Sequence, residues 1–373
     1  MKIVADENQP QIREAFADAG ELTLLPPAAI TGAVLRDADA LICRSTVAIN
    51  EALLAATSVK FVGTCTIGFD HVDLNYLHAR GIGFAAAAGC NANSVGEYVA
   101  AALLRWATDR GGALSGKTLG IVGAGNVGKN VARKARALGM NILLNDPPRA
   151  QIEGDAEFVE LPTLLAASDF VSLHVPLTRG GEFSTVKLAD EKFFAAMKDG
   201  AVFVNTARGK VVDEDALSRG LGRRRPAAAI LDVYAGEPRP RPDFLRRLYL
   251  ATPHIAGYSY DGKVNGTVII RQKFAEFFGG KNAWRPGPPP PNFCVSRIGI
   301  ESKAPLLVEL QDVVGAVYDL SADSRAFLAA PTKFAELRAN YPLRLEFSHT
   351  RVAAPPDAPE LTAALAGLGF AVE

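Results

Sequence analysis

The sequence predicts an α/β protein in which a doubly wound parallel sheet is inserted into a second parallel α/β domain. Two series of short apolar segments alternate with helical stretches, one in residues 1–100 and one from Thr118 to about Pro253. Such alternation is typical of βαβ units and parallel sheets. A glycine-rich motif opens the second series, so we expect the second sheet to bind a ligand.

The first series contains four expected strands and one long helix. The strands are expected at residues 3–5, 40–43, 61–62 and 82–85. The helix is expected at Ser94–Trp106, because Ser94 and Glu97 have the spacing of a capping box and two glycines, Gly111 and Gly112, follow.

The second series contains five expected strands and leads into a further helix. The strands are expected at residues 118–122, 141–145, 170–174, 201–205 and 228–233, and the helix at residues 262–278. Arg285–Asn292 is rich in proline, which excludes helix and central strand and predicts a stiff extended linker. The residues after this linker mix helical and strand patterns, which predicts a small third domain.

Composition excludes several classes of partner. The chain has 40 Lys and Arg against 40 Asp and Glu, so it has no net attraction for nucleic acid or an anionic membrane. Acidic residues near the N-terminus and the absence of long apolar runs speak against a signal peptide and a membrane span. The scattered cysteines predict buried free thiols, no metal site and a cytoplasmic location; they are Cys43, Cys65, Cys90 and Cys294.

The motif Gly120–Gly128 has the context of a dinucleotide site. A predicted strand precedes it, an apolar-periodic helix follows over residues 126–138, and a second strand ends in Asp146, 18 residues after Gly128. Gly123 allows the turn, Gly125 lets the pyrophosphate approach, and Gly128 lets the helix pack on the sheet. Asp146 is expected to accept hydrogen bonds from the adenosine ribose, which favours NAD over NADP.

Three polar residues follow late strands of the same predicted sheet: Arg208, Glu237 and His254. Oxidation of an alcohol needs a base for the hydroxyl proton, and histidine titrates near neutral pH. A neighbouring carboxylate orients the imidazole and stabilises its protonated form. An arginine can bind a substrate carboxylate through two hydrogen bonds. Together the three side chains predict dehydrogenation of a hydroxy acid.

These residues resemble the D-isomer-specific 2-hydroxyacid dehydrogenases over about residues 40–260. The resemblance rests on the glycine motif and on the segments His174–Thr178, Asn205–Gly209, Asp232–Pro238 and Pro253–His254. It implies a Rossmann domain at residues 96–256, inserted in a flavodoxin-like substrate domain formed by residues 1–95 and 257–284. A linker at 285–292 and a small α+β dimerisation domain at 293–373 complete the expected order.

The resemblance also implies the roles of individual residues. Arg208, Glu237 and His254 take the catalytic positions, with His254 as acid and base. The positions expected to contact NAD are Gly123, Gly125, Asn126, Val127, Gly128, Asp146, Val175, Thr206, Ala207, Asp232 and Gly257. The positions expected to contact substrate are Ser45, Thr66 and Tyr258, and Arg44 and Arg338 are candidates for binding a phosphate.

Other segments resemble one branch of the family; they are Met1–Asn8, Arg44–Ser45, Gly63–His71, Gly89–Ala92, Asp146–Arg149, His254–Ser259, Val317–Asp319 and Leu337–Pro342. This branch implies a homodimer that oxidises 4-phospho-D-erythronate at C2 with NAD. The product would be 3-hydroxy-2-oxo-4-phosphobutanoate, in pyridoxal 5'-phosphate (vitamin B6) biosynthesis. Two alternatives stay open: a D-3-phosphoglycerate or other D-2-hydroxyacid dehydrogenase, and a non-catalytic NAD-sensing scaffold.

Overall fold

The computed structural model describes residues 1–290, 297–301 and 304–373. The chain divides into two compact units. The first unit contains residues 1–91 and 258–293, and the second contains residues 92–257 and 294–373. The C-terminal segment therefore shares a unit with the segment predicted to bind the dinucleotide, and its separation as a third domain stays a prediction.

The first unit is built on a five-stranded parallel sheet with the order β2-β1-β3-β4-β5. This is the flavodoxin-like strand order. The strands are β1 (Lys2–Asp6), β2 (Glu21–Leu25), β3 (Ala40–Cys43), β4 (Phe61–Thr64) and β5 (Gly83–Ala86). The four predicted strands are confirmed. The fifth strand, β2, was not predicted. β2 is an edge strand that buries none of its residues fully, so its apolar signal is weak.

Helices cover both faces of this sheet. Two apolar clusters lie on opposite faces, one with α1 and α12 and one with the remaining helices. The helices are α1 (Ile12–Phe16), α2 (Gly32–Leu35), α3 (Glu51–Leu54), α4 (Leu74–Ala79) and α12 (Tyr260–Phe278), with a 3-10 turn η1 (Pro27–Ala29).

Helix α12 fastens the returning chain to the N-terminal residues. The Phe274 ring lies 5.2 Å from the Phe16 ring and 5.9 Å from the Phe61 ring, between their centroids. The buried Arg271 Nε donates to the Ala15 carbonyl at 2.8 Å. Gly287 lies beyond α12, and the Gln11 side chain binds both its N–H and its carbonyl. Residues far apart in sequence thus form one domain.

The second unit contains a six-stranded parallel sheet with the order β11-β10-β9-β8-β6-β7. Its strands are β6 (Thr118–Val122), β7 (Asn141–Asn145), β8 (Phe170–Leu173), β9 (Val202–Asn205), β10 (Ala228–Leu231) and β11 (Leu250–Ala251). The five predicted strands are confirmed, and the short β11 was not predicted. The order of the strands reverses between β6 and β8, where doubly wound folds bind ligands at the carboxyl ends.

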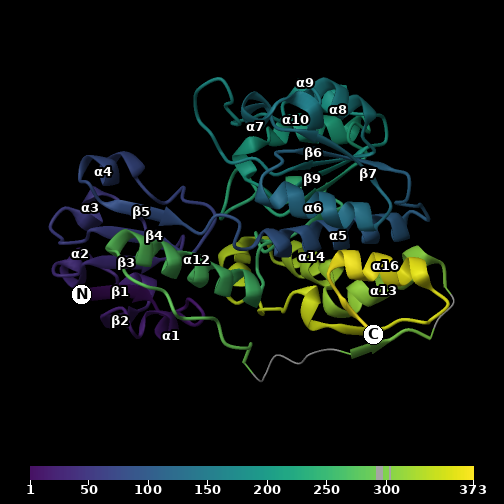
Figure 1. Cartoon of the computed structure of the whole chain (residues 1–373). Helices are drawn as coiled ribbons and strands as arrows, with labels where there is room; N and C mark the ends of the chain where they lie inside the picture. Colours follow the sequence, from purple (N-terminus) through teal and green to yellow (C-terminus); the bar gives the residue numbers. More distant parts are fainter. Residues whose placement is uncertain (291–296, 302–303) are drawn as a thin grey trace. The chain divides into compact units, whose positions relative to one another are not determined.

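Two layers of helices enclose this sheet, as Figure 1 shows. Helices α5 (Ala92–Asp109) and α6 (Asn126–Ala137) cover one face. Helices α8 (Leu161–Ala167), α9 (Glu191–Ala196) and α10 (Glu214–Gly222) cover the other. The connections hold α7 (Pro147–Glu153), α11 (Pro242–Leu245) and the 3-10 turns η2 (Asp155–Glu157) and η3 (Gly209–Val211).

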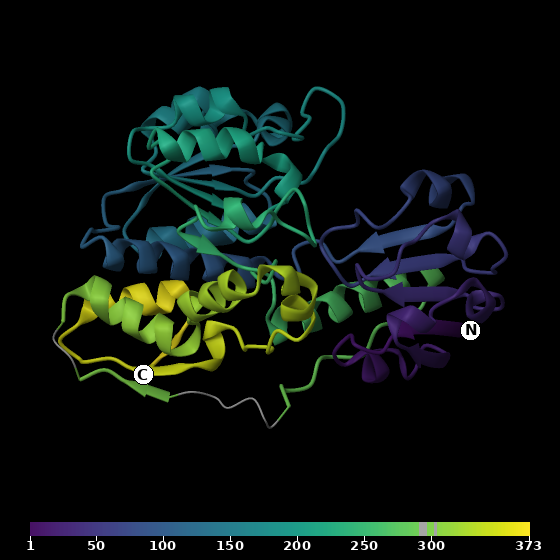
Figure 2. The same cartoon turned by 180° about the vertical axis from the view of Figure 1, so that it is seen from behind.

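The C-terminal segment adds a layer outside α5 and α6 (Figures 1 and 2). Helix α13 packs on α5, α16 packs on α6, and α14 packs on β11. The helices of the C-terminal segment are α13 (Leu306–Val317), α14 (Leu320–Ala329), α15 (Phe334–Ala339) and α16 (Pro359–Leu368), with 3-10 turns η4 (Pro331–Lys333) and η5 (Phe347–His349). A parallel sheet of β12 (Arg297–Gly299), β13 (Arg351–Ala353) and β14 (Ala371–Val372) completes it.

One local prediction was wrong. Helix α5 begins at Ala92, so Ser94 lies within it and does not cap it. The Ser94 hydroxyl instead donates to the Ala256 carbonyl at 3.0 Å, and the Glu97 carboxylate accepts the Phe347 N–H at 2.9 Å. The two residues that have the spacing of a capping box therefore make long-range contacts.

Two predictions can be compared with the structure only in part, because each includes residues outside the described ones. Residues 285–290 of the predicted linker form neither helix nor strand, whereas Pro291 and Asn292 lie outside the described residues. Three of the four cysteines, Cys43, Cys65 and Cys90, are buried free thiols as predicted. Cys294 lies outside the described residues.

Candidate active site

The three predicted catalytic residues follow three neighbouring strands. Arg208 follows β9, Glu237 follows β10 and His254 follows β11. These strands are adjacent and parallel, in the order β11-β10-β9. The loops that carry the three side chains therefore start from the same edge of one sheet.

His254 and Glu237 form a hydrogen-bonded pair. The Glu237 Oε2 atom lies 2.8 Å from His254 Nδ1, and Glu237 Oε1 accepts the Tyr234 N–H at 2.8 Å. The side chains are 28% and 23% exposed, so the pair is partly shielded from water. Burial raises the pKa of Glu237. Its bond to His254, the histidine's charge, the bond from the Tyr234 N–H and the charge of Arg338 together outweigh burial and hold that pKa below its usual value. The carboxylate is therefore charged and can orient the imidazole.

Asp232 holds the loop that carries His254. Its Oδ1 atom accepts from the Thr252 hydroxyl and the Ile255 N–H, each at 2.7 Å, and Oδ2 accepts from the Ala256 N–H at 2.9 Å. Asp232 is 1% exposed. Burial raises its pKa to about 6, although these hydrogen bonds and the charge of His254 act in the opposite direction. This structural role was not predicted for Asp232, whose expected contact with cofactor stays a prediction.

The backbone of His254 has φ 59°, in the left-handed region that residues other than glycine rarely adopt. Asp232 binds backbone N–H groups just after this residue and the hydroxyl of Thr252 before it. Such a conformation persists only where its surroundings fix it. The buried carboxylate thus supports the conformation that presents the imidazole.

Asn205 organises the loop that carries Arg208. Its side-chain oxygen accepts the Ala207 N–H at 2.9 Å, and its amide donates to the Arg208 carbonyl at 3.0 Å. The Arg208 guanidinium donates to the Ala207 carbonyl at 2.7 Å and is half-buried. Thr206 and Ala207, predicted to contact NAD, lie in this same loop. Sequence reasoning missed Asn205, whose only signal is a polar residue at the end of an apolar strand.

The glycine motif has the geometry of a dinucleotide-binding turn between β6 and α6. Gly123 has φ 92°, and a Cβ atom on Gly128 would lie 2.2 Å from the Gly123 carbonyl oxygen. A Cβ atom on Gly125 would meet no atom within 4 Å, so the backbone there is open to a ligand. No side chain caps the start of α6. Its free N–H groups and helix dipole suit a diphosphate.

Asp146 lies at the end of β7 and faces this turn. Its Oδ2 atom accepts the Ala124 N–H at 2.8 Å, and Oδ1 accepts the Arg149 N–H at 3.2 Å. The Arg149 guanidinium pairs with Glu153 and donates to the Ala124 carbonyl. The carboxylate is thus fixed beside the glycine turn, where the ribose of NAD would bind.

His174 lies at the end of β8, next to Val175 of the predicted NAD site. Its Nε2 atom lies 2.8 Å from the Ser172 hydroxyl, and its Nδ1 atom lies 3.5 Å from that of Thr206. Burial lowers the pKa of His174 to about 3, so its imidazole is neutral at physiological pH. A neutral histidine here connects strand β8, through Ser172, to the loop after β9, through Thr206.

The predicted substrate contacts belong to the first unit. Ser45 is exposed in the turn after β3, and Thr66 lies in the loop after β4. The Thr66 hydroxyl donates to the Gly68 carbonyl at 3.0 Å. Tyr258 precedes α12, and the Lys263 ammonium lies 4.4 Å from the centroid of its ring. The first unit thus offers three hydroxyl groups at the starts of loops or helices.

A pocket of about 200 Å³ lies behind the His254 loop, within the second unit. Pro253 and Ile255, which flank His254, form one wall. The C-terminal segment supplies the rest: Asp323, Ala326, Phe327, Glu336, Leu337, Asn340, Tyr341 and Pro342. The charge of Arg338, from this same segment, lowers the pKa of Glu237. C-terminal residues therefore adjoin the candidate catalytic pair.

Comparisons with known proteins match this geometry. Residues 91–256 match the family described as D-isomer specific 2-hydroxyacid dehydrogenase, NAD binding domain. The chain is 42% identical to erythronate-4-phosphate dehydrogenase of Chromohalobacter salexigens, over 100% of this chain and 99% of that protein. It is also 42% identical to the Escherichia coli enzyme of that name, over 93% of each chain. The chain belongs to the erythronate-4-phosphate dehydrogenase family.

Solved structures of related dehydrogenases share most of the fold. The NAD-bound 3-phosphoglycerate dehydrogenase of Entamoeba histolytica is 27% identical with a TM-score of 0.63, and it covers 75% of this chain and 95% of its own. D-lactate dehydrogenase of Aquifex aeolicus, solved with NAD and lactic acid, is 27% identical with a TM-score of 0.61. That match covers 75% of this chain and 96% of the lactate dehydrogenase. These matches leave part of the present chain uncovered, whereas the Chromohalobacter enzyme matches all of it.

The chain is thus an NAD-dependent dehydrogenase of the α/β class, as the sequence predicted. The glycine turn, the uncapped helix and the fixed carboxylate of Asp146 fit the dinucleotide. Within the described part of the chain, no helix combines the length and the apolar character that crossing a membrane requires.

The carboxylate of Asp146 leads to a prediction about cofactor choice. Serine at this position can still cap α7 but has no charge to bind the ribose hydroxyls or repel a 2'-phosphate. We expect Asp146→Ser to lower kcat/KM for NAD by about tenfold, as for loss of a hydrogen bond to a charged group, and to reduce the preference over NADP. Steady-state kinetics with both cofactors will measure this, and an unchanged ratio would contradict it.

The low pKa of His174 leads to a prediction about stability. Between its usual pKa of 6.5 and about 3, the unfolded chain binds a proton here that the folded chain does not. Stability relative to a His174→Asn variant should therefore fall as the pH is lowered from 7.5 to 5, by up to about 1.4 kcal/mol per pH unit below 6.5. Urea unfolding of both proteins at several pH values will test it; a constant difference would rule out a neutral buried imidazole.

Proposed function

We propose that this chain oxidises C2 of 4-phospho-D-erythronate with NAD, giving 3-hydroxy-2-oxo-4-phosphobutanoate for pyridoxal 5'-phosphate biosynthesis. The observation that carries the proposal is the hydrogen-bonded pair of His254 and Glu237. Their loops follow β11 and β10, and Arg208 follows the next strand of the sheet, β9. The names of relatives that match the whole chain supply the substrate.

His254 is the proposed base. Its Nδ1 atom faces Glu237, so Nε2 is the atom that takes the proton from the C2 hydroxyl. Glu237 stabilises the imidazolium that forms, because its depressed pKa keeps it charged. Bound NAD would supply the acceptor for the hydride that leaves C2. Arg208 binds the substrate carboxylate and polarises the C2 oxygen.

The proposed substrate carries a carboxylate and a phosphate, and it needs more groups than the catalytic three. Ser45, Thr66 and Tyr258 offer hydroxyl donors, and we assign them to the substrate. Arg44 and Arg338 are the proposed partners of the phosphate, since guanidinium groups bind phosphate through paired hydrogen bonds. The nearness of Arg338 to Glu237, seen in the pKa of that carboxylate, supports this assignment.

We also propose that the chain is a cytoplasmic homodimer formed through its C-terminal segment. The sheet β12-β13-β14 has three short strands, and no strand among the described residues pairs with the outer edge of β12 or β14. Leu306, at the start of α13, is 38% exposed. Three buried free thiols suit a reducing compartment.

An assay of two substrates tests the proposal against both alternatives. Purified protein would be incubated with NAD and either 4-phospho-D-erythronate or D-3-phosphoglycerate, with a trap for the 2-oxo acid, and nicotinamide reduction would be followed. We expect turnover with the erythronate. Preference for phosphoglycerate would keep the chemistry and overturn the substrate, whereas NAD binding without turnover of either would support the scaffold.

The role of Glu237 gives a second prediction. We expect Glu237→Gln to lower kcat by about 100-fold and to change KM by less than about threefold, because the amide no longer stabilises the imidazolium. Glu214→Gln is the matched control, since Glu214 also binds a backbone N–H after β10, that of Ala235 at 2.8 Å. The control should keep its kcat, and equal losses in both variants would contradict a catalytic role.

A further inference from the structure

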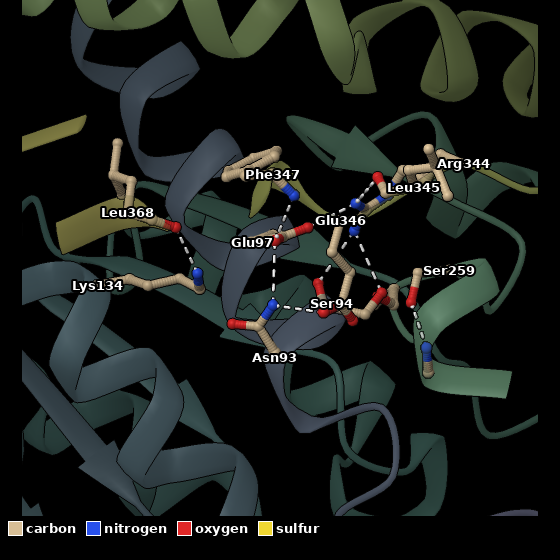
Figure 3. A network of polar contacts seen from close by, with 12 residues as sticks. Asn93, Ser94, Glu97, Lys134, Ser259, Arg344, Leu345, Glu346, Phe347 and Leu368 are labelled. Atoms are coloured by element: carbon tan, nitrogen blue, oxygen red, sulfur yellow. Dashed lines mark hydrogen bonds and ion pairs between the residues drawn. The ribbon is translucent and has the colours of Figure 1, made fainter. Parts of the chain in front are cut away.

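Arg344 and Glu97 form a buried ion pair between the C-terminal segment and helix α5 (Figure 3). The Arg344 side chain is 10% exposed and that of Glu97 is fully buried. Glu97 also accepts from the Phe347 N–H at 2.9 Å and the Asn93 amide at 3.1 Å. The Arg344 guanidinium lies 4.0 Å from the centroid of the Tyr318 ring. Arg344 is thus held between an anion and an aromatic face.

The same guanidinium reaches the candidate catalytic loop through Ser94. Arg344 Nη2 donates to the Ser94 hydroxyl at 3.2 Å and to the Ser94 carbonyl at 3.3 Å. The Ser94 hydroxyl donates in turn to the carbonyl of Ala256 at 3.0 Å. Ala256 lies two residues beyond His254, and Asp232 binds its N–H. Ser94 and Asp232 therefore fix both polar groups of the Ala256 backbone.

Helix α5 holds the other flank of this loop as well. The Tyr98 hydroxyl lies 2.7 Å from the Thr252 hydroxyl, which donates to Asp232. The Tyr98 ring meets the Tyr318 ring edge to face, with centroids 6.4 Å apart. One turn of α5 thus contacts residues on both sides of His254, and the C-terminal segment packs against that turn.

We propose that Arg344 is a positioning residue for His254. It fixes Ser94 and so the Ala256 carbonyl, which maintains the left-handed backbone at His254. A buried ion pair contributes little to stability compared with apolar residues of similar size, so stability alone does not account for this one. The inference rests on the proposed role of His254.

Two variants separate positioning from folding. Arg344→Lys keeps a cation against Glu97, but an ammonium group lacks the planar fork that reaches Glu97 and Ser94 together. Ser94→Ala removes the link and leaves the ion pair in place. The matched controls are Arg105→Lys, which alters an ion pair with Asp109 on the same helix, and Ser168→Ala, which removes a hydroxyl as buried as that of Ser94.

We expect kcat with 4-phospho-D-erythronate to fall by about 10- to 100-fold in both test variants, because small errors in placing a catalytic group have large effects on rate. KM and NADH affinity, measured by fluorescence, should change by less than about threefold. The His254 resonance in spectra of histidine-labelled protein should shift in both test variants. The controls should match the parent in kcat and in this resonance.

Unchanged kcat and an unchanged His254 resonance in Ser94→Ala and Arg344→Lys would overturn the inference. If the parent turned over neither substrate, the proposed function would fail, and the resonance alone would decide the inference. A shift of that resonance in the test variants, with none in the controls, would support positioning by Arg344. A shift in all four variants would overturn it.

Discussion

The site depends on the buried carboxylate of Asp232. A charged group in an apolar interior is costly unless hydrogen bonds satisfy it, and Asp232 receives three from the segment Thr252–Ala256. Those bonds join the end of β10 to the loop after β11, where β11 itself has only two residues. This loop presents the imidazole of His254, so the bonds from Asp232 hold the candidate catalytic segment in place where a longer β11 would otherwise hold it through strand pairing.

Parallel strands explain why the candidate catalytic residues are distant in sequence but follow neighbouring strands of one sheet. Each βα unit brings the next strand back in the same direction, so every strand ends at the same edge. Arg208, Glu237 and His254 need no local motif beyond a loop after their own strand. Asn205 and Asp232 then fix the loops of Arg208 and His254 with side-chain bonds to backbone groups.

The strands with continuous apolar runs could be predicted from sequence, and β6 and β7 were predicted to the residue. Strands β2 and β11 could not be predicted in this way. β2 is partly exposed and β11 has only two residues, so neither has enough buried positions to give a recognisable strand pattern in the sequence. The candidate catalytic pair was predicted from residue types and strand ends. The contact between His254 and Glu237 is confirmed, and their catalytic role stays a prediction. The structural roles of Ser94, Glu97 and Asp232 were not predicted, because their hydrogen-bond partners lie far along the chain. At Ser94 and Glu97, the local spacing favours a capping box instead.

The error at Ser94 shows how local and tertiary interactions compete. Serine and glutamate at this spacing stabilise the start of a helix by binding its free N–H groups. In this chain the helix starts two residues earlier, and both side chains bind groups from elsewhere: the Ala256 carbonyl, the Phe347 N–H and Arg344. A cap needs only local residues, whereas this network needs the C-terminal segment. The network therefore ties the geometry of the His254 loop to a part of the chain that follows the candidate catalytic residues in sequence.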